Sequence, residues 1–403
     1  MSSRQVIFIN RFYWPEKPAT GQLLTDLAEE LAARGQTVTV VTSGLSALPR
    51  SETHRGVGIH RLRSARSQSS GAAAKALAWT GFSIAALWWL FRRLNAGDTV
   101  VLMTDPPLLS LFAGPMARMK GARVIHWVQD VYPELPMILG GGGWLRPLRW
   151  LRNREWIHAT DCVALGPDMR DLMKRQGLAP ARITVIENWA PLSLAPANPA
   201  QIANLRRKRG LEGKFAVVYS GNLGRVHELE GVIRLAARLQ DEPGLQFLFI
   251  GEGAQLSRLQ SLATAQRLPN VRFLPSQNRG DLAASLGAAD VHLVTLREGC
   301  EALVFPSKFY GILAAARPVF YIGPTQAELA RRIQTDGIGA AFARDELDAM
   351  AEELKRWHRD PPLVARMSER AADISRQYGG LASAANLWQK LLSATDTNPA
   401  ANS

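Results

Sequence analysis

A glycine-containing stretch in the second half of the chain has the residue types that bind phosphate. The sequence YSGNLG, from Tyr219 to Gly224, follows an apolar run and is itself followed by Arg225. Glycines let the backbone approach a ligand closely, and the N–H groups at the start of a helix attract anions. Arg225 can neutralise a diphosphate through paired hydrogen bonds. The pattern is compatible with phosphate binding by Gly221, Asn222 and Arg225, and also with an ordinary turn.

A later segment places a serine and a lysine at the start of a helix. The sequence VFPSKFYGILAAARP, from Val304 to Pro318, makes Ser307 a candidate helix N-cap and puts Lys308 in the first helical turn. A cation at that position opposes the helix dipole. This slightly disfavours the interpretation of Lys308 as an ordinary surface lysine.

Acidic residues follow a strand-like run in the first half of the chain. The sequence QDVYPE, from Gln129 to Glu134, comes directly after a run that ends at Val128. Because ligands bind at the carboxyl ends of parallel strands, we expect Asp130 and Glu134 to project toward a cleft there. Asp130 is the first candidate to orient or deprotonate an acceptor hydroxyl. The alternative is a structural aspartate in the turn before the following proline.

The sequence has no evident metal site. No carboxylate pair of the Asp-x-Asp type stands at the end of a strand, so a metal-held diphosphate has no obvious ligand set. The two cysteines, Cys162 and Cys300, are too few and too far apart for a disulfide scaffold or a structural zinc site. We therefore expect a reaction without a metal ion or other cofactor, in a reducing compartment.

Strands and helices alternate around these candidate residues. Short apolar runs such as Thr37–Thr42 have the β-branched density of buried strands, and the segments between them have helical periodicity. Such alternation predicts parallel sheets with helices on both faces. The expected strands are Val6–Asn10, Thr37–Thr42, Thr99–Met103, Arg123–Val128, Asp161–Ala164, Ile183–Ile186, Ala216–Ser220, Gln246–Ile250, Val271–Leu274, Val291–Val294 and Val319–Ile322.

A proline-rich interruption divides this alternation into two series. The segment ENWAPLSLAPANPAQ, from Glu187 to Gln201, has little periodicity and is typical of a linker. We expect two Rossmann-like α/β domains facing across a cleft, over residues 1–190 and 191–375. A C-terminal helix and a flexible polar tail are expected over residues 376–403. The length of 403 residues agrees with two cores of this size.

The charge of the chain restricts its partners. The net charge is +13 and the sequence pI is near 10.2, which calls for a polyanion such as nucleic acid, anionic lipid or a phosphorylated small molecule. The N-terminus has no signal peptide, so export is not expected. The longest uncharged stretch, Ala76–Phe91, is shorter than the ~20 residues that span a bilayer.

Seven segments, taken in order, resemble one enzyme family. They are FYWPEKPATGQLLTDLAEELAARGQTVTVVTS, WVQDVYPE, VIENW, VVYSGNLGRVHELEGV, FIGEGA, VRFLPSQNRGDLAASLGAADVHLV and PSKFYGILAAARPV. The set is similar to the sugar-nucleotide glycosyltransferases of the GT-B fold. Within these it resembles the large retaining family 4, which includes bacterial O-antigen, colanic-acid and other exopolysaccharide transferases. The resemblance covers about residues 5–390. It implies transfer of a sugar from a nucleotide-diphosphate donor, with anomeric retention, in the synthesis of cell-surface polysaccharides such as lipopolysaccharide.

The resemblance also implies where the donor binds. The stretch Pro18–Gln22, with Gly21, corresponds to a loop near the donor phosphates and the acceptor. Arg225 matches a basic residue that contacts the donor diphosphate, and Lys308 would complete that clamp beside Ser307. Two cations there could stabilise the leaving phosphate without a metal ion.

The nucleobase would rest on the loop from Leu274 to Arg279, which includes Pro275. Glu298 resembles a glutamate near the donor sugar, and Glu301 competes for that role. A second family glutamate, which holds ribose, is replaced here by Gly311. The donor base, in UDP or GDP, therefore stays open.

Two stretches point to a membrane-bound acceptor. The sequence WLRPLRWLRNREW, from Trp144 to Trp156, places tryptophans, leucines and arginines at helical spacing, and Ala76–Phe91 adds three tryptophans before Arg92. Basic, tryptophan-bearing helices lie well at a headgroup boundary, although ordinary core helices would give a similar pattern. We expect a peripheral protein on the cytoplasmic face of the plasma membrane, with an acceptor sugar carried on a polyprenyl diphosphate.

Two other functions are compatible with parts of this sequence. A sugar-nucleotide epimerase of the same fold would also bind a nucleotide sugar, but it would not need the tryptophan-arginine helices. A nucleic-acid-binding protein would account for the charge. Against it, the basic residues are dispersed and no recognition helix or RNA-binding motif is evident.

Overall fold

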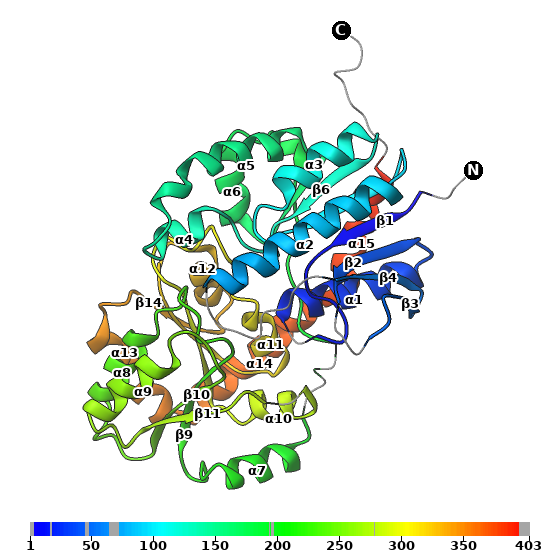
Figure 1. Ribbon diagram of the computed structural model, residues 1–403. Helices are drawn as coiled ribbons and strands as arrows, with labels where there is room; N and C mark the ends of the chain where they lie inside the picture. The colour runs from blue at the N-terminus through cyan, green and yellow to red at the C-terminus, as the bar shows by residue number, and fades with distance from the viewer. Residues whose placement is uncertain are drawn as a thin grey trace. The chain divides into compact units, whose positions relative to one another are not determined.

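The computed structural model describes residues 4–16, 18–44, 48–63, 72–192, 194, 197–277 and 279–394 (Figure 1). Within them the chain forms two compact units. Unit 1 has the limits Met1–Asn188, Ala302–Phe305 and Leu381–Ser403, and unit 2 has the limits Trp189–Glu301 and Pro306–Gly380. The expected tail beyond residue 394 lies outside the described residues.

Unit 1 is built on an eight-stranded sheet in the order β3-β4-β2-β1-β5-β6-β7-β8. All neighbouring strands are parallel except β3 and β4. Its central strands are apolar and fully buried because helices cover both faces. The strands are β1 (Val6–Ile9), β2 (Val38–Ser43), β3 (Ser51–His54), β4 (Val57–Leu62), β5 (Thr99–Met103), β6 (Arg123–Trp127), β7 (Asp161–Ala164) and β8 (Ile183–Val185).

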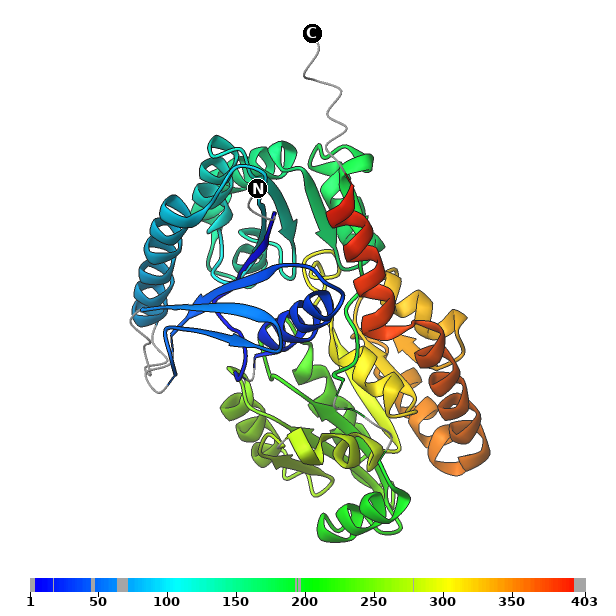
Figure 2. The ribbon, with the colours of Figure 1, turned by 90° about the vertical axis from the view of Figure 1, so that its right-hand side faces the viewer.

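The helices of unit 1 follow its strands along the chain. They are α1 (Ala19–Ala33), α2 (Ala72–Arg93), α3 (Ser110–Met119), α4 (Glu134–Ile138), α5 (Arg146–His158) and α6 (Pro167–Arg175), with short 3-10 turns at Gly143–Leu145 and Pro180–Arg182. The terminal helix α15 (Gly380–Ser393), red in Figure 2, also packs on this unit. Its Trp388 lies edge-on to Phe8 and to Trp127, with ring centroids 5.9 and 5.2 Å away.

Unit 2 is built on a six-stranded, fully parallel sheet in the order β11-β10-β9-β12-β13-β14. The strands are β9 (Phe215–Ser220), β10 (Leu245–Ile250), β11 (Val271–Leu274), β12 (Val291–Thr295), β13 (Val319–Ile322) and β14 (Gly339–Phe342). The helices are α7 (Pro199–Lys208), α8 (Leu229–Arg238), α9 (Leu256–Ala265), α10 (Leu282–Gly287), α11 (Lys308–Ala314), α12 (Glu328–Thr335), α13 (Leu347–Arg359) and α14 (Pro361–Gln377), with a 3-10 turn at Arg279–Asp281.

Both units are therefore Rossmann-like, and the predicted α/β fold class is confirmed. Some elements differ from the expectation. The hairpin β3–β4 extends the first sheet, α7 begins inside the expected linker, and β14 completes the second sheet.

Candidate functional site

The strand order of unit 2 defines where a ligand should bind. The chain adds β10 and β11 on one side of β9, and β12, β13 and β14 on the other. The order reverses between β9 and β12, and ligands of open α/β sheets bind outside the carboxyl ends of the strands at such a switch point. The loop that leaves β9 there is Gly221–Glu228, called the glycine loop below.

Glycines allow this loop to pack tightly on its neighbour. A Cβ atom on Gly251 would lie 2.1 Å from the carbonyl oxygen of Gly221, and one on Gly253 would lie 2.6 Å from the backbone of Leu223. Gly221, Gly251 and Gly253 also have positive φ angles of 134°, 141° and 154°, which disfavour a side chain. The turn from Ile250 to Ala254, called the IGEGA turn below, thus has a packing role, because its glycines allow the glycine loop to pack against it.

Hydrogen bonds fix the far end of the glycine loop. Gln255 donates from Nε2 to the carbonyl oxygens of Gly224 and His227, at 2.6 and 3.1 Å. The backbone N–H of Arg297, just after β12, donates to the carbonyl of Val226 at 2.8 Å. Loops from three strands therefore hold one another in place, which preorganises the site.

The side chain of Lys308 lies beneath the glycine loop. Its Nζ atom is buried, although other parts of the residue are partly exposed. Nζ lies 3.4 Å from the centre of the Tyr219 ring, and a Cβ on Gly221 would stand 3.4 Å from it. Among the described residues Nζ has no hydrogen-bond partner. Burial holds the pKa of Lys308 well below its usual value, so this amine lacks the anion that would stabilise its charge.

His227 lies at the same edge of the sheet. Its Nδ1–H donates to the carbonyl of Thr295 at 2.8 Å, at the end of β12. Burial, together with the charge of Lys308, lowers the pKa of His227 to about 3. His227 is therefore neutral at physiological pH, and its hydrogen bond ties the glycine loop to β12.

Arg225 and Asn222 occupy the outer part of the glycine loop. Both side chains are exposed, and Arg225 makes no hydrogen bond or ion pair within the described residues. The carbonyl of Asn222 accepts a hydrogen bond from the Tyr219 hydroxyl at 2.8 Å. Arg225, in the glycine loop, and Lys308, at the start of α11, thus belong to the same unit. The side chain of Arg225 is exposed, whereas Nζ of Lys308 is buried.

The expected nucleobase loop begins beside the IGEGA turn. The carbonyl of Leu274 accepts a hydrogen bond from the N–H of Gly251 at 3.0 Å, and that of Pro275 accepts one from Gln277 Nε2 at 2.8 Å. Asn278 lies outside the described residues. Leu274 and Pro275 are therefore at the carboxyl edge, next to the turn that supports the glycine loop.

Two glutamates follow β12 in different environments. The side chain of Glu298 is exposed, whereas Oε2 of Glu301 is buried and has no hydrogen-bond partner among the described residues. Ser307 occupies the N-cap position of α11, as predicted, although its hydroxyl makes no capping hydrogen bond. A Cβ on Gly311 would meet Leu286 at 3.6 Å, an ordinary apolar contact.

Unit 1 has its own switch point, between β1 and β5. Asp130 follows the neighbouring strand β6 and is partly exposed at its carboxyl end. The pKa of its carboxyl is raised to about 6, by burial first and by the charge of Asp105 second. Asp105 follows β5 and pairs with Arg11, which follows β1, at 3.0 Å. Sequence reasoning missed Arg11 and Asp105, although the carboxyl-end argument that selected Asp130 applies to both.

Two expectations for unit 1 are wrong. Gly21 lies in the first turns of α1 and not in a loop. It is glycine because a Cβ would come within 3.0 Å of Phe12. Glu134 begins α4 and forms an ion pair with the buried Arg152 of α5. It is therefore not an unpaired carboxylate at the carboxyl ends of the strands. Arg152 also stacks on Trp156 at 3.8 Å, which removes both residues from the surface.

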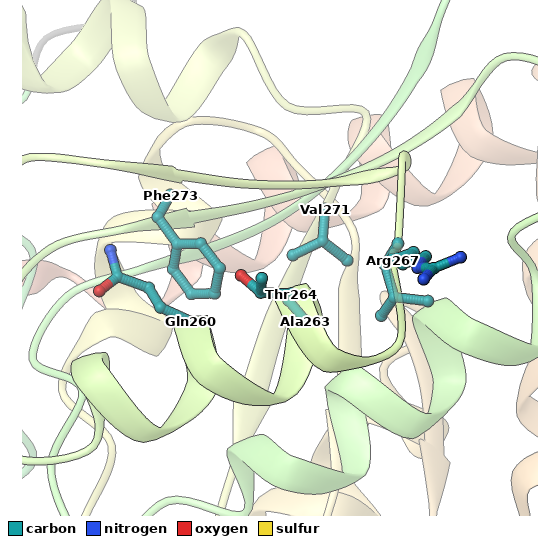
Figure 3. A pocket seen from close by; sticks show the side chains of 7 residues that line it. Gln260, Ala263, Thr264, Arg267, Val271 and Phe273 are labelled. Atoms are coloured by element: carbon teal, nitrogen blue, oxygen red, sulfur yellow. The ribbon is translucent and has the colours of Figure 1, made fainter.

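A recess of about 490 Å³ opens elsewhere on unit 2, between α9 and the edge strand β11 (Figure 3). It is lined by Gln260, Ala263, Thr264, Arg267, Leu268, Val271 and Phe273. These residues come from the second half of α9, the connection into β11 and β11 itself. Within the described part of the chain no group of three or more His, Cys, Asp or Glu side chains could hold a metal ion.

Comparison with known families gives two consecutive matches that together span most of the chain. Residues 20–189 match the glycosyl transferase 4-like domain, and residues 201–373 match the glycosyl transferases group 1. The chain belongs to the glycosyltransferases. The two units of this glycosyltransferase are the two Rossmann-like domains of the GT-B fold, and the enzyme is a transferase.

Named relatives agree with this assignment. The chain is 26% identical over 368 residues to the putative colanic acid biosynthesis glycosyl transferase WcaI of Escherichia coli, covering 85% of the chain and 89% of WcaI. It is 31% identical over 258 residues to the probable glycosyltransferase WbjE of Pseudomonas aeruginosa, covering 62% and 63%. The crystal structure of HepE from Anabaena in complex with UDP-glucose superposes with a TM-score of 0.75 at 16% identity, covering 97% of the chain and all (100%) of HepE.

Proposed function

We propose that this glycosyltransferase binds a nucleoside-diphosphate sugar at the switch point of unit 2, with its diphosphate at Lys308 and Arg225. The sugar passes, with retention and without a metal ion or other cofactor, to a sugar carried on a polyprenyl diphosphate. The observation that carries the proposal is the buried Nζ of Lys308, which has no hydrogen-bond partner among the described residues. A UDP-linked donor is favoured over a GDP-linked one by the likeness to HepE, whose structure contains UDP-glucose.

The proposed role of Lys308 and Arg225 in sugar transfer is electrostatic. Cleavage of the sugar–diphosphate bond leaves negative charge on the departing phosphate, and fixed cations at that position stabilise the transition state more than the ground state. The amine of Lys308 lies against the Tyr219 ring and beneath the glycine loop, and an anionic diphosphate at that position would stabilise its charged form. Arg225 can add a second, exposed cation from the same loop. The pair supplies the charge that a metal ion would otherwise provide.

The surface of unit 1 supports a lipid-linked acceptor. Helices α2, α3 and α5 lie side by side (Figure 1), and each exposes large apolar side chains. We call this surface the aromatic face. Its exposed aromatic and methionine side chains include Trp88 (56%), Phe91 (59%), Phe112 (64%), Met119 (88%) and Trp150 (62%), with Trp144 (78%) in the 3-10 turn just before α5, and Leu77 (65%) and Ile84 (63%) add aliphatic surface on α2.

Cations lie among these rings. Arg92 stacks over Trp88 at 4.4 Å, and Arg154 lies over Trp150 at 5.6 Å. Arg146 and Arg149 are also exposed on α5. Aromatic rings that enter the headgroup region, with arginines that meet lipid phosphates, are the features of a surface-bound protein. Within the described residues no helix is long and apolar enough to cross a membrane.

An ion pair stiffens the aromatic face from behind. Arg118 of α3 donates two hydrogen bonds of 2.7 Å to the buried carboxylate of Glu155 on α5. Gly114 allows this approach, because a Cβ there would lie 1.7 Å from Glu155 Oε1. The exposed rings therefore belong to a fixed surface. We infer that it rests on the cytoplasmic leaflet of the plasma membrane, where a polyprenyl-linked acceptor for cell-surface polysaccharide is presented.

Donor binding and transfer are tested together. The protein is titrated calorimetrically with UDP, GDP and ADP, and each matching sugar nucleotide is incubated in EDTA with and without a polyprenyl-diphosphate-linked sugar. We expect one nucleotide to bind, release of that nucleotide only when acceptor is present, and a product with the donor's anomeric configuration. Loss of activity in EDTA would contradict metal independence, and turnover without acceptor would contradict transfer.

Membrane contact is tested with vesicles of phosphatidylglycerol and phosphatidylcholine. Trp88→Ser with Trp150→Ser should lower vesicle binding at least tenfold, while Leu192→Ser, at a position that is 65% exposed in unit 2, should leave it unchanged. Binding should also weaken with salt. Equal binding by all variants would contradict the assignment of the aromatic face.

A further inference from the structure

An aromatic ring forms one wall of the recess between α9 and β11 (Figure 3). β11 is an edge strand of the second sheet and pairs with β10. The ring of Phe273 stacks on the buried ring of Phe249 from β10, with centroids 5.1 Å apart and 17° between the ring planes. One face of Phe273 is therefore covered by the neighbouring strand. The residue stays partly exposed, and its exposed part belongs to the recess.

Two polar side chains of α9 lie beside this ring. Gln260 and Thr264 are four positions apart and therefore share one side of the helix. Figure 3 shows both next to Phe273. Both residues are exposed, and neither side chain makes a hydrogen bond within the described part of unit 2. An amide and a hydroxyl, which can both donate and accept, are thus available to a ligand.

The rest of the lining is apolar at its floor and carries no opposed charges. Ala263 and Leu268 are buried, and Val271 packs against the same core. All seven lining residues are described, and none of them is acidic. The guanidinium of Arg267 points away from Phe273 (Figure 3). The volume of about 490 Å³ lies within the ~300–1,000 Å³ of small-molecule sites.

A sugar ring in the pyranose form matches this combination of groups. Its C–H bonds give it an apolar face, which packs on the face of an aromatic ring. Its hydroxyl groups extend from the rim of the ring, where they donate and accept hydrogen bonds. An aliphatic ligand would make no use of the amide and the hydroxyl, and an anion would find no cation beside the aromatic ring.

The recess lies on one face of the edge strand. Successive side chains of a strand point to opposite faces of the sheet. Val271 and Phe273 pack against the core that includes Leu259 of α9, whereas Leu274 packs against the core on the other face, with Ile250. The expected nucleobase loop begins at Leu274, so its first side chain does not belong to the recess.

We propose that the recess is a second carbohydrate site, in which one sugar unit of an oligosaccharide stacks on Phe273 and hydrogen-bonds with Gln260 and Thr264. This inference goes beyond the proposed function, because the site is separate from the glycine loop and from Lys308. The sugar is bound there and is not transferred. The recess offers one ring face and a few polar groups, so a single oligosaccharide binds weakly and NMR is the suitable measurement.

The test uses the whole protein with carbon-13 in the methyl groups of alanine, leucine and valine. Maltohexaose, laminarihexaose and chitohexaose, which differ in linkage or in sugar, are titrated separately up to their solubility limits. At least one should shift the methyl signals of Ala263, Leu268 and Val271, which line the recess. No shift with any of the three, or shifts confined to other methyl groups, overturns the proposal. Displacement of the oligosaccharide by UDP or GDP would assign the recess to the nucleotide and also overturns it.

Variants then test the named contacts. Gln260→Ala with Thr264→Val removes both polar groups from exposed helix positions and should lower oligosaccharide affinity about tenfold, because two hydrogen bonds are lost. Phe273→Leu keeps an apolar contact with the core but removes the ring face, and it should also weaken binding. Gln266→Ala is the matched control, at an exposed glutamine that ends α9 outside the recess. Equal affinity in all variants overturns the proposal.

Nucleotide binding separates this result from failure of the proposed function. The double variant Gln260→Ala with Thr264→Val should bind the donor nucleotide with wild-type affinity, because the recess is separate from the glycine loop. Loss of oligosaccharide and nucleotide binding together would place these residues in the donor site and overturn the inference. Oligosaccharide binding by a protein that binds no nucleotide would refute the proposed function and support the second site.

Discussion

Replacement of Lys308 by methionine should have two effects of opposite sign. Methionine keeps the volume of the side chain but removes the ammonium. The donor diphosphate then loses a charge-assisted hydrogen bond, which contributes about 2–3 kcal/mol. Dissociation constants for the donor nucleotide should therefore rise roughly 30- to 150-fold. In the free protein the same change should stabilise unit 2.

The stability gain follows from the contacts of Nζ. The atom is buried without a hydrogen-bond partner among the described residues, and such a donor costs about 1–3 kcal/mol. The methionine sulfur can pack on the Tyr219 ring, where Nζ now lies 3.4 Å from the centre. Thermal unfolding should occur at a temperature higher by about 2–4 °C per kcal/mol gained.

Calorimetric titration with the nucleotide that the wild type binds measures the loss of affinity. Thermal unfolding of the nucleotide-free protein measures the gain in stability. Lys208→Met is the matched control, because this lysine is exposed on α7 of the same unit, and both quantities should stay at their wild-type values. Weak binding together with lower stability would show that Lys308 is structural. Unchanged binding would remove it from the donor site.

Three other changes have defined outcomes. Arg225→Ala should weaken donor binding and transition-state stabilisation together by about 2–3 kcal/mol. Calorimetric titration and steady-state kinetics measure the two effects, and wild-type values in both would exclude Arg225 from the donor site. Gly251→Ala should destabilise by about 3 kcal/mol or more, because its Cβ would meet the Gly221 carbonyl at 2.1 Å. Gly213→Ala, with positive φ in open space, should cost much less in the same unfolding assay. Glu155→Gln should cost about 2 kcal/mol at pH 7. Although burial opposes it, the pKa of Glu155 is lowered by its arginine and histidine partners. The free energy of unfolding that the ionised Glu155 contributes is therefore lost as pH falls below about 4.3. In urea unfolding, the stability of Glu155→Gln should depend less on pH in that range than the stability of the wild type does.

Buried strands could be read from the sequence because burial on both faces leaves continuous apolar runs. The expected strands Thr99–Met103 and Val271–Leu274 agree with β5 and β11 at both ends. The strand Val57–Leu62 was missed because only alternate residues are buried. The helix Pro199–Lys208 was missed because Pro199 and the prolines before it suggested a linker. In the structure Pro199 begins the helix, and Asn198 caps it by accepting a hydrogen bond of 2.9 Å from the N–H of Ala200.

Long-range packing was not readable from local patterns. Residues Ala302–Phe305 and the terminal helix join unit 1, although unit 2 lies between them and Asn188 in the sequence. Arg152 and Trp156 were grouped with the surface residues of α5, but both are buried. Periodicity gives the spacing of a helix and does not reveal which neighbour covers each side.

The candidate site was predictable where it follows from topology. Asp130 was selected because it follows a parallel strand, and it lies at that edge of the sheet. The burial of Lys308 Nζ against Tyr219 depends on residues 89 positions apart, so no local pattern could show it. Its role in donor binding and the roles of Arg225, Glu298 and Glu301 stay predictions.

The most direct measurement is a crystal structure of the protein with the nucleoside diphosphate that binds it. The account predicts that a phosphate oxygen lies within hydrogen-bond distance of Lys308 Nζ at the carboxyl ends of β9 and β12. A nucleotide bound away from that edge, with Nζ still unpartnered beneath the glycine loop, would contradict it.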